Sequence, residues 1–393
     1  MNKDKRKIAF ALFQSAQLAD GGVNSARVLL SHLNTCSPII ITQRESALTE
    51  EFKNKNYPVH LLSTNRIPGT SIWVTGIGEG ILDLIRIVSS NIWCVLFLLR
   101  HKISTLHCND ILAFLYLGLG AKLVGAKVIF VLRRSFAQGE NISWKHKLAF
   151  SLANQIITLS AEMGESLREQ IKCLNGDKVV PLYSGVDREK FYPVDSYERQ
   201  EIRHKLGMSC CSINIAYVGT ISPRKGQLEF LKQVCPQLRA TLPQHKIYFL
   251  GAATEDNLSY QEKCLAIRQE LQLEENVFFV GEVENIANWY RACDFVVLAS
   301  QSEGLARAMI EALSVGTPVI SFAVSSAREV LRRFRCGLVI EANNYDKLSK
   351  AIVDLSKNRV QRTIFRNNAL LAAGRLFDAK KQTDIFEGYL KRD

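Results

Sequence analysis

Short apolar runs rich in β-branched residues alternate with helical patterns along the whole of this 393-residue chain. Strands that are separated by helices pair in parallel through right-handed crossovers, so the alternation predicts α/β domains with parallel sheets. A chain of this length exceeds what one hydrophobic core holds, and we expect two domains. The expected strands lie near residues 8–13, 39–42, 59–62, 105–107, 128–132, 156–159 and 179–182, and then near 213–218, 247–250, 277–280, 295–298, 319–322 and 338–340.

A loop without hydrophobic periodicity separates the two series of strands. It covers residues 183–193, where Gly185 and Pro193 bracket the segment. We therefore expect a first domain over residues 1–185 and a second domain that begins at residue 186. Each is predicted to be a Rossmann-like, doubly wound unit, in which ligands bind at the carboxyl ends of the strands.

The composition, 47% apolar and 22% charged residues, is that of an ordinary folded soluble protein. The ten cysteines have neither metal-binding nor disulfide spacing, which favours reduced thiols in a cytoplasmic protein. The apolar run at residues 8–13 is short and lacks a cleavage signature, so it predicts a first strand rather than a signal peptide.

The net charge of +12 is unevenly distributed. Residues 1–185 hold 21 Lys and Arg against 13 Asp and Glu, a net charge of +8, which leaves +4 for the remainder. A basic first half favours an anionic partner such as a lipid surface or a phosphate-bearing acceptor. No nucleic-acid-binding motif accompanies the charge, so nucleic acid is not expected as a partner.

Residues 81–100 are unusually apolar, but their uninterrupted apolar run is only 92–99, far short of a membrane span. We expect a helix packed on the first sheet. The alternative is a helix at a membrane interface, which Asp83 and Arg86 disfavour by giving the segment a modest polar face.

Two glutamates stand eight residues apart in the segment 302–311, directly after the expected strand 295–298. Glu303 falls on a loop and Glu311 on the helix that follows. A loop that leads into a helix N-terminus offers backbone N–H groups to an anion, while each carboxylate can accept hydrogen bonds from hydroxyls. A ligand with hydroxyls at both ends and phosphate between them fits this pattern. The alternative is an ordinary amphipathic helix that carries two acids.

A second segment, 217–226, follows the first strand of the second domain. Gly219 lets the backbone pass close to a ligand, and Arg224 with Lys225 places two cations where the chain enters a helix. This arrangement favours phosphate binding over a solvated basic loop.

Together these segments resemble the retaining glycosyltransferases of family 4, which have the GT-B fold: two Rossmann-like domains facing each other across a cleft. The resemblance rests on the Glu-x7-Glu pair and on Gly185-Val-Asp-x3-Phe-x-Pro193 at the domain boundary. It also implies that the C-terminal helix, residues 377–393, returns to the first domain, so the second covers 186–376. Ser184 stands where the family commonly has Asn, and Ala299-Ser300 where it often has Pro-Ser.

The resemblance assigns roles in donor binding to the second domain. Arg224 and Lys225 would hold the diphosphate and act in catalysis, Glu303 would contact sugar hydroxyls and also act in catalysis, and Glu311 would bind the ribose. The other donor-binding positions of this domain are Gly219, Gly281, Val283, Gly304 and Leu305.

The first domain is expected to complete the site. Gly21 and Gly22 open a helix after the first strand and would approach the donor. Asn109 and, as a second candidate, His107 end a strand where the family has catalytic residues. Arg133 and Arg134 end the next strand and are candidates for an anionic acceptor, although they also fit a basic pair on the surface.

The implied activity is retaining transfer of a sugar from a nucleotide-diphosphate donor to a glycan or lipid-linked saccharide, in cell-surface polysaccharide or lipopolysaccharide synthesis. Neither a cofactor nor a metal is expected, since no Asp-x-Asp motif occurs. No carboxylate nucleophile stands out in the first domain. This favours a mechanism in which the acceptor attacks the sugar on the same face as the departing nucleoside diphosphate. The expected location is the cytoplasm, with peripheral contact to an anionic membrane surface. The alternatives are a nucleotide-sugar epimerase and an inactive module that binds nucleotide or membrane.

Overall fold

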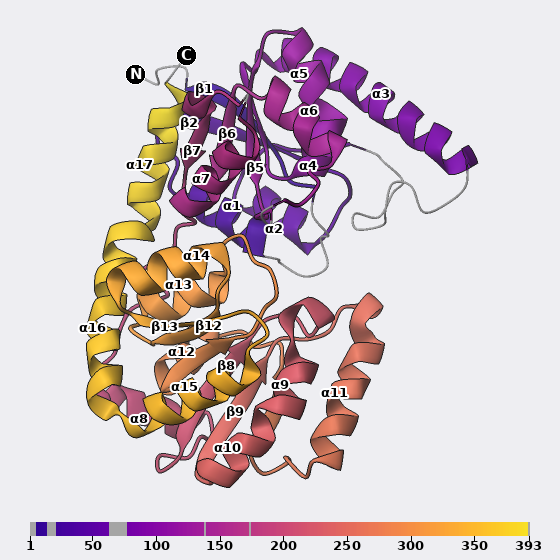
Figure 1. Cartoon of the computed structure of the whole chain (residues 1–393). Coiled ribbons are helices and arrows are strands. Elements are labelled where there is room, and N and C mark those ends of the chain that lie inside the picture. Colours follow the sequence, from indigo (N-terminus) through magenta and orange to yellow (C-terminus); the bar gives the residue numbers. More distant parts are fainter. Residues whose placement is uncertain (1–4, 14–20, 63–76, 137–138, 173, 392–393) are drawn as a thin grey trace. The chain divides into compact units, whose positions relative to one another are not determined.

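The computed structural model describes residues 5–13, 21–62, 77–136, 139–172 and 174–391. The chain forms two compact units (Figure 1). Unit 1 comprises Met1–Gly185 and Ala379–Asp393, and unit 2 comprises Val186–Asp378. The second crossing between the units therefore lies at residue 379, where the sequence suggested 377.

Unit 1 is built on a seven-stranded sheet with the order β3-β2-β1-β4-β5-β6-β7, and every neighbouring pair is parallel. All seven strands lie within a few residues of the predicted positions, because most of them are apolar runs buried on both faces, whereas the edge strand β3 is only partly buried. The strands are β1 (Arg6–Ala11), β2 (Cys36–Thr42), β3 (Val59–Leu61), β4 (Thr105–Cys108), β5 (Lys127–Leu132), β6 (Gln155–Thr158) and β7 (Val179–Pro181).

Helices connect these strands, and three of those described begin at a side chain that caps the first turn. Ser46 and Thr49 form a reciprocal capping box, Asp110 accepts from the N–H of Ala113, and Ser160 accepts from the N–H of Met163. The helices of unit 1 are α1 (Gly21–Ser31), α2 (Ala47–Asn54), α3 (Ile77–His101), α4 (Ile111–Ala113), the π-helical turn η1 (Phe114–Gly118), α5 (Leu119–Leu123), α6 (Trp144–Leu152), α7 (Ala161–Gln170) and α17 (Ala379–Leu390).

The helix expected at residues 81–100 is α3, but its main packing partners and the length of its apolar stretch differ from the expectation. It packs against η1 and α5. Within the described part of the chain, its segment Ile81–His101 is the one stretch that is long and apolar enough to cross a membrane, and 33% of an 18-residue window in it is buried. The uninterrupted apolar run therefore understated how apolar this helix is.

The C-terminal helix α17 belongs to unit 1 through specific polar contacts. The Glu387 carboxylate accepts hydrogen bonds from the backbone N–H groups of Asn34 and Thr35, at 2.8 and 2.7 Å. Arg6 donates to the carbonyl of Leu390 at 3.0 Å. Phe386, fully buried, lies against the ring of Phe10 in β1. These contacts join the last helix to the first strand.

Unit 2 contains a six-stranded parallel sheet with the order β10-β9-β8-β11-β12-β13. Its core centres on three aromatic rings, those of Tyr217, Phe230 and Phe249, which meet within 4.9–6.2 Å. The strands are β8 (Ile213–Val218), β9 (His245–Leu250), β10 (Val277–Gly281), β11 (Phe295–Leu298), β12 (Val319–Phe322) and β13 (Gly337–Ile340). The helices are α8 (Ser196–Lys205), α9 (Gln227–Gln233), α10 (Cys235–Thr241), α11 (Leu258–Glu270), α12 (Ile286–Ala292), α13 (Arg307–Ser314), α14 (Ser325–Ala327), α15 (Tyr345–Lys357) and α16 (Arg359–Leu376).

Both sheets reverse their strand order at the first strand of the unit. In unit 2, β8 pairs with β9 on one side and β11 on the other, and in unit 1, β1 pairs with β2 and β4. The loops that leave such neighbouring strands diverge to opposite faces and open a crevice at the carboxyl edge of the sheet. This topology decides which sequence motifs meet.

Candidate functional site

The loop after β8 holds two cations in a fixed place. Pro223, Arg224 and Lys225 form a single 3-10 turn that ends at Gly226, whose φ is +75°. The hydroxyl of Tyr217 donates to the carbonyl of Lys225 at 2.5 Å, so the buried core of the unit fixes this turn from below. A side chain at Gly226 would meet the carbonyl oxygen of Ala299 at 2.7 Å, and glycine is therefore required where the two loops touch.

Glu303 lies on the loop after β11, beside both cations. Its Oε1 is 2.6 Å from Nζ of Lys225 and 3.1 Å from the guanidinium of Arg224. The Arg224 guanidinium also donates to the carbonyl of Ser302 at 2.9 Å, and the Arg224 carbonyl accepts from the N–H of Gln301. The parallel pairing of β8 with β11 brings these residues together across 78 positions of sequence.

The charges around Glu303 decide its protonation. Burial would raise the pKa of this carboxyl, but Lys225 and Arg224 oppose that effect, and the net result is a pKa below the usual value. The Glu303 side chain is 12% exposed and the Lys225 side chain is 14% exposed, whereas the Arg224 side chain is half exposed. The site therefore contains an ionised carboxylate held by two cations.

Gly219 supports this arrangement from underneath. Its φ is +147°, a backbone conformation that side chains disfavour, and a Cβ there would lie 3.1 Å from Cε of Lys225. The position predicted to let the backbone approach a ligand is thus also the position against which the Lys225 side chain packs.

Glu311, the fifth residue of α13, has its own partners. Its Oε1 accepts from Nε of Arg307 at 2.9 Å, and its Oε2 accepts from the hydroxyl of Tyr290 at 3.2 Å. Tyr290 is fully buried, and its pKa is raised well above the usual value by burial and then by Glu311. Of the four side chains expected to act together, the structure brings Glu303, Arg224 and Lys225 into contact and places Glu311 in a separate network.

Sequence analysis missed Arg307 and Tyr290 as the partners of Glu311. The signal for Arg307 is its spacing, since residues four apart on a helix are neighbours. Tyr290 had no sequence signal, because α12 and α13 come together only in the folded unit.

The remaining predicted donor positions are backbone positions. Gly304 and Leu305 are buried immediately before α13, and no hydrogen bond to a described residue engages their N–H groups. Gly281 ends β10 with a φ of +83° and open space where a Cβ would be, and its carbonyl accepts from the N–H of Gly251. Val283 is half-buried in the loop that follows. Both β8 and α13 belong to unit 2, and Figure 1 labels each of them.

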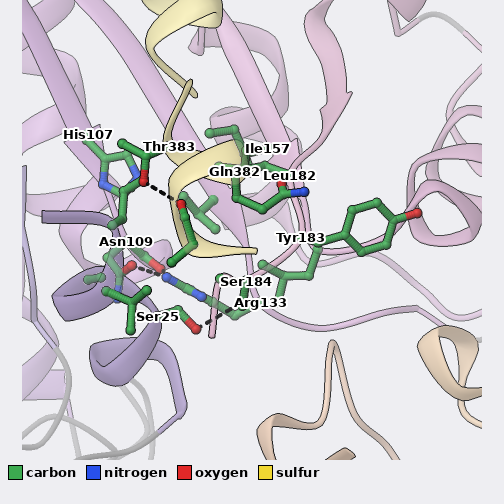
Figure 2. Close-up of a pocket in the computed structure, with 17 residues that line it drawn as sticks. Ser25, His107, Asn109, Arg133, Ile157, Leu182, Tyr183, Ser184, Gln382 and Thr383 are labelled. Carbon is green, nitrogen blue, oxygen red and sulfur yellow. Dashed lines mark hydrogen bonds between the residues drawn. The ribbon is translucent and has the colours of Figure 1, made fainter. Parts of the chain in front are cut away.

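Unit 1 contains a pocket at the carboxyl end of its sheet (Figure 2). Arg133 reaches into it from the end of β5 and hydrogen-bonds to both oxygens of Asn109, the backbone carbonyl at 3.0 Å and the side-chain amide oxygen. Arg133 also donates to the carbonyl of Gly22 at 3.4 Å, in the first turn of α1. Three predicted segments therefore meet here: the helix that Gly21 begins, the end of β4 and the end of β5.

The two adjacent arginines separate. Arg134 pairs with Glu140, lies 4.9 Å from the ring of Phe136, and has a half-exposed side chain. Of the two candidates for an anionic acceptor, only Arg133 lines the pocket.

His107 lines the same pocket but is 3% exposed. Its ring lies 4.7 Å from that of Phe10 and 5.6 Å from that of Phe386, and Nδ1 has no hydrogen-bond partner among the described residues. Burial, with a smaller contribution from Arg133, lowers the pKa of this imidazole to about 3. At neutral pH His107 is uncharged, which suits a hydrogen-bonding group better than a proton donor.

The pocket also contains residues that sequence analysis did not select. The hydroxyl of Ser25 donates to that of Ser184 at 2.9 Å, and Gln382 and Thr383 enter from α17 (Figure 2). Ser184 was noted only as a departure from the family motif. The polar residues of α17 could not be placed from sequence, since their position depends on where the last helix docks.

Known proteins resemble this chain in sequence and in fold. Residues 198–371 match the family model of glycosyl transferases group 1. This match covers most of unit 2, including its Arg224, Lys225 and Glu303 site, and less than half of the chain. It supports the glycosyltransferase resemblance drawn from sequence, whereas the assignment to the retaining family 4 stays a prediction.

Curated relatives and solved structures extend the match. The chain is 29% identical over 203 residues to a GDP-mannose-dependent monoacylated alpha-(1-6)-phosphatidylinositol monomannoside mannosyltransferase of Corynebacterium glutamicum, and 24% identical over 216 residues to the lipopolysaccharide core biosynthesis mannosyltransferase LpsB of Rhizobium meliloti. These matches cover 49% and 53% of this chain, and the chain spans only 50% and 61% of the length of those relatives.

Anabaena HepE in complex with UDP superposes with a TM-score of 0.80 at 19% identity, covering 98% of this chain and 99% of that one. WaaG, a glycosyltransferase involved in lipopolysaccharide biosynthesis, superposes with a TM-score of 0.70 at 16% identity, covering 97% and 100%. At such identities the likeness shows the fold, which confirms the predicted GT-B class.

Proposed function

We propose that this protein is a retaining, metal-independent glycosyltransferase of the family 4 type, which transfers a hexose from a nucleotide-diphosphate donor. The observation that carries the proposal is the contact of Lys225 and Arg224 with Glu303, at 2.6 and 3.1 Å, in the unit that matches the group 1 family. Two cations and one ionised carboxylate suit a ligand that has both phosphate and hydroxyl groups.

In the donor complex, Lys225 and Arg224 would bind the diphosphate. Glu303 would then accept hydrogen bonds from sugar hydroxyls, while Glu311 would accept them from the ribose. The backbone N–H groups of Gly304 and Leu305 would donate hydrogen bonds to phosphate oxygens of the donor. UDP and UDP-glucose complexes of HepE, which shares this fold, support a nucleotide-sugar donor.

The chemistry of this site would be electrostatic. As the glycosidic bond of the donor breaks, negative charge grows on the leaving diphosphate, and Lys225 and Arg224 would stabilise that charge more strongly than they stabilise the intact donor. This role needs neither a cofactor nor a divalent metal. In the part of the chain that the structure describes, no three His, Cys, Asp or Glu side chains cluster as metal ligands would.

Unit 1 would bind the acceptor, a glycan or lipid-linked saccharide, through Arg133 and the polar pocket around Asn109. The relatives named above act on a phosphatidylinositol mannoside and in lipopolysaccharide core synthesis, which supports a role in cell-surface polysaccharide or lipopolysaccharide synthesis. Such acceptors would place the protein in the cytoplasm, in peripheral contact with an anionic membrane surface.

The test is a panel of nucleotide sugars, first by thermal shift and then by turnover with lipid-linked and soluble acceptors. We expect one donor to support transfer, the product to retain the anomeric configuration by NMR, and EDTA to leave the rate unchanged. Glu311→Ala should abolish transfer by the folded protein, although the melting temperature should fall, since the Tyr290 hydroxyl and Arg307 lose their acceptor. An epimerised donor in the absence of acceptor, or nucleotide binding without any turnover, would replace this proposal with an epimerase or with an inactive binding module.

A further inference from the structure

The outer face of α3 is apolar, and its inner face buries both polar and apolar residues. The exposed large side chains follow helical spacing along one stripe, and each is more than half exposed: Ile81, Leu84, Ile85, Val88, Ile92, Leu96 and Leu99. The opposite side buries Asp83, Ser90 and Asn91, which are 2–8% exposed. The same side also buries Cys94, Phe97 and Leu98. An ordinary surface helix turns polar side chains to solvent, whereas the outward face of α3 is apolar as well.

The buried polar side fixes α3 to the rest of unit 1. The side-chain amide of Asn91 donates to the carbonyl of Leu115 at 2.9 Å, and its oxygen accepts from the N–H of Gly120 at 2.7 Å. Gly120 is required at this crossing, because a Cβ there would lie 2.2 Å from the carbonyl oxygen of Asn91. Figure 1 shows α5 beside the long helix α3.

These contacts decide how α3 can meet a bilayer. Its length and mean hydropathy of 1.8 suit a membrane span. To span, however, the helix would have to leave α5 and carry Asp83, Ser90 and Asn91 into hydrocarbon without their partners, which is costly. A helix of 25 residues is about 37 Å long, so lying flat it presents a long apolar stripe at the level of the lipid headgroups.

The charges beside the stripe are basic. Arg100 and Lys102 are exposed at its C-terminal end, and Arg86 is partly exposed. Between residues 81 and 102 the sequence has a single acid, Asp83, which is buried and pairs with Arg86 at 3.2 Å. An apolar stripe flanked by cations complements an anionic lipid surface, where acyl chains and phosphate groups lie side by side.

We propose that the exposed face of α3 is a membrane-docking surface, which inserts its apolar side chains among lipid acyl chains while Arg100 and Lys102 bind anionic headgroups. The inference deepens the proposed function by naming the surface through which unit 1 reaches a membrane. It does not require that the acceptor itself be a lipid.

The experiment is cosedimentation of the full chain with vesicles, in the absence of donor and acceptor. Vesicles of phosphatidylcholine with phosphatidylglycerol are compared with vesicles of phosphatidylcholine alone. The parent should bind the anionic vesicles more tightly. A triple variant, Ile85→Gln with Ile92→Gln and Leu96→Gln, should bind about 1,000-fold more weakly, since burial of each such side chain contributes roughly a tenfold gain in affinity.

A matched control exists on unit 2. Val360, Ile364 and Leu371 on α16 are 70%, 51% and 58% exposed, close to the 58%, 57% and 63% of Ile85, Ile92 and Leu96. The triple Gln variant of these α16 residues should bind vesicles as the parent does. Equal loss of binding in both triple variants, or undiminished binding by the α3 variant, would overturn the proposal.

A charge variant tests the same surface without changing its apolar residues. Arg100→Gln with Lys102→Gln should weaken binding to anionic vesicles by roughly 10- to 30-fold. Lys350→Gln with Lys357→Gln, two exposed lysines of α15, makes the same change in net charge and should have a small effect. If both pairs weaken binding equally, the specific role of α3 is refuted.

The rival occupant is a second copy of the chain. A dimer in solution that the α3 triple variant dissociates, together with no vesicle binding by the parent, would overturn the proposal in favour of a protein interface. The two proposals can fail separately. Transfer to a soluble acceptor without vesicle binding would refute only the membrane-docking surface. Vesicle binding without any sugar transfer would refute only the proposed glycosyltransferase activity.

Discussion

Nζ of Lys225 lies 2.6 Å from Oε1 of Glu303, although 78 residues separate them in the sequence. The same carboxylate oxygen also contacts the guanidinium of Arg224, so Glu303 is paired with two cations. An incoming anionic ligand would therefore meet cations that already have a partner. Donor binding is expected to exchange this ion pair for contacts with phosphate, leaving Glu303 available to hydroxyl groups.

Lys225→Met should lower kcat by about 100- to 1,000-fold, because it removes a positive charge that would stabilise the leaving diphosphate. It should also raise the pKa of Glu303, since burial would then be opposed only by Arg224 and by the hydrogen bond from Ser300. Steady-state kinetics with the best donor measure the first effect. Lys350→Met, on the exposed side of α15, is the matched control. Unchanged turnover in Lys225→Met would contradict the assigned role.

Gly219→Ala should reduce both stability and turnover. The φ of +147° adds strain that lowers the free energy of unfolding by about 1–3 kcal/mol, and the new Cβ displaces Lys225, which it would approach to 3.1 Å. Gly207→Ala is the control, because Gly207 also has a positive φ, +66°, but open space around it. Chemical denaturation should show a loss in both variants, whereas only Gly219→Ala should lose activity. Equal turnover in the two would show that the position of Lys225 is unimportant.

Arg133→Gln should raise the KM for the acceptor by about tenfold, as expected for the loss of one charged hydrogen bond, with a smaller change in the KM for the donor. Arg134→Gln should leave both constants near the parent, because its side chain pairs with Glu140 away from the pocket. The melting temperature of each variant separates binding from folding. If Arg134→Gln has the larger effect on acceptor KM, the pocket does not bind the acceptor.

His107 predicts a defined dependence of stability on pH. Its folded pKa is lowered to about 3, chiefly by burial, whereas an unfolded histidine titrates near 6.5. Between these values the unfolded chain binds a proton that the folded chain excludes. The free energy of unfolding therefore falls as the pH falls, by about 1.4 kcal/mol per pH unit within the window.

The substitution His107→Gln removes that titration. Denaturation curves at pH 8 give the cost of the substitution itself, and the additional loss between pH 6 and pH 4.5 should be smaller in the variant than in the parent. If the free energy of unfolding falls equally with pH in the two proteins, His107 is protonated in the folded protein over this pH range. His107 would then again be a candidate general acid.

Sequence alone determined the elements and the boundary between the units. Most strands of the described residues are apolar runs buried on both faces, which leaves little choice of structure, although the edge strands β3, β10 and β13 are only partly buried. Gly185 marks where the first segment of unit 1 ends. The motifs with cations and acids were also visible, because parallel sheets place functional loops directly after strands.

Only the tertiary structure decided which of these motifs touch. The pairing of β8 with β11 joins Lys225 to Glu303, while Glu311 turns to Arg307 and Tyr290 instead. The pairing of neighbouring strands also sends Arg133 into a pocket and leaves Arg134 outside it. For α3, the sequence recorded an apolar segment, but the partners of Asn91 decided which face is buried. Local sequence sets the conformation of a segment, whereas contacts between distant segments depend on strand order and helix docking, which no short stretch of sequence encodes.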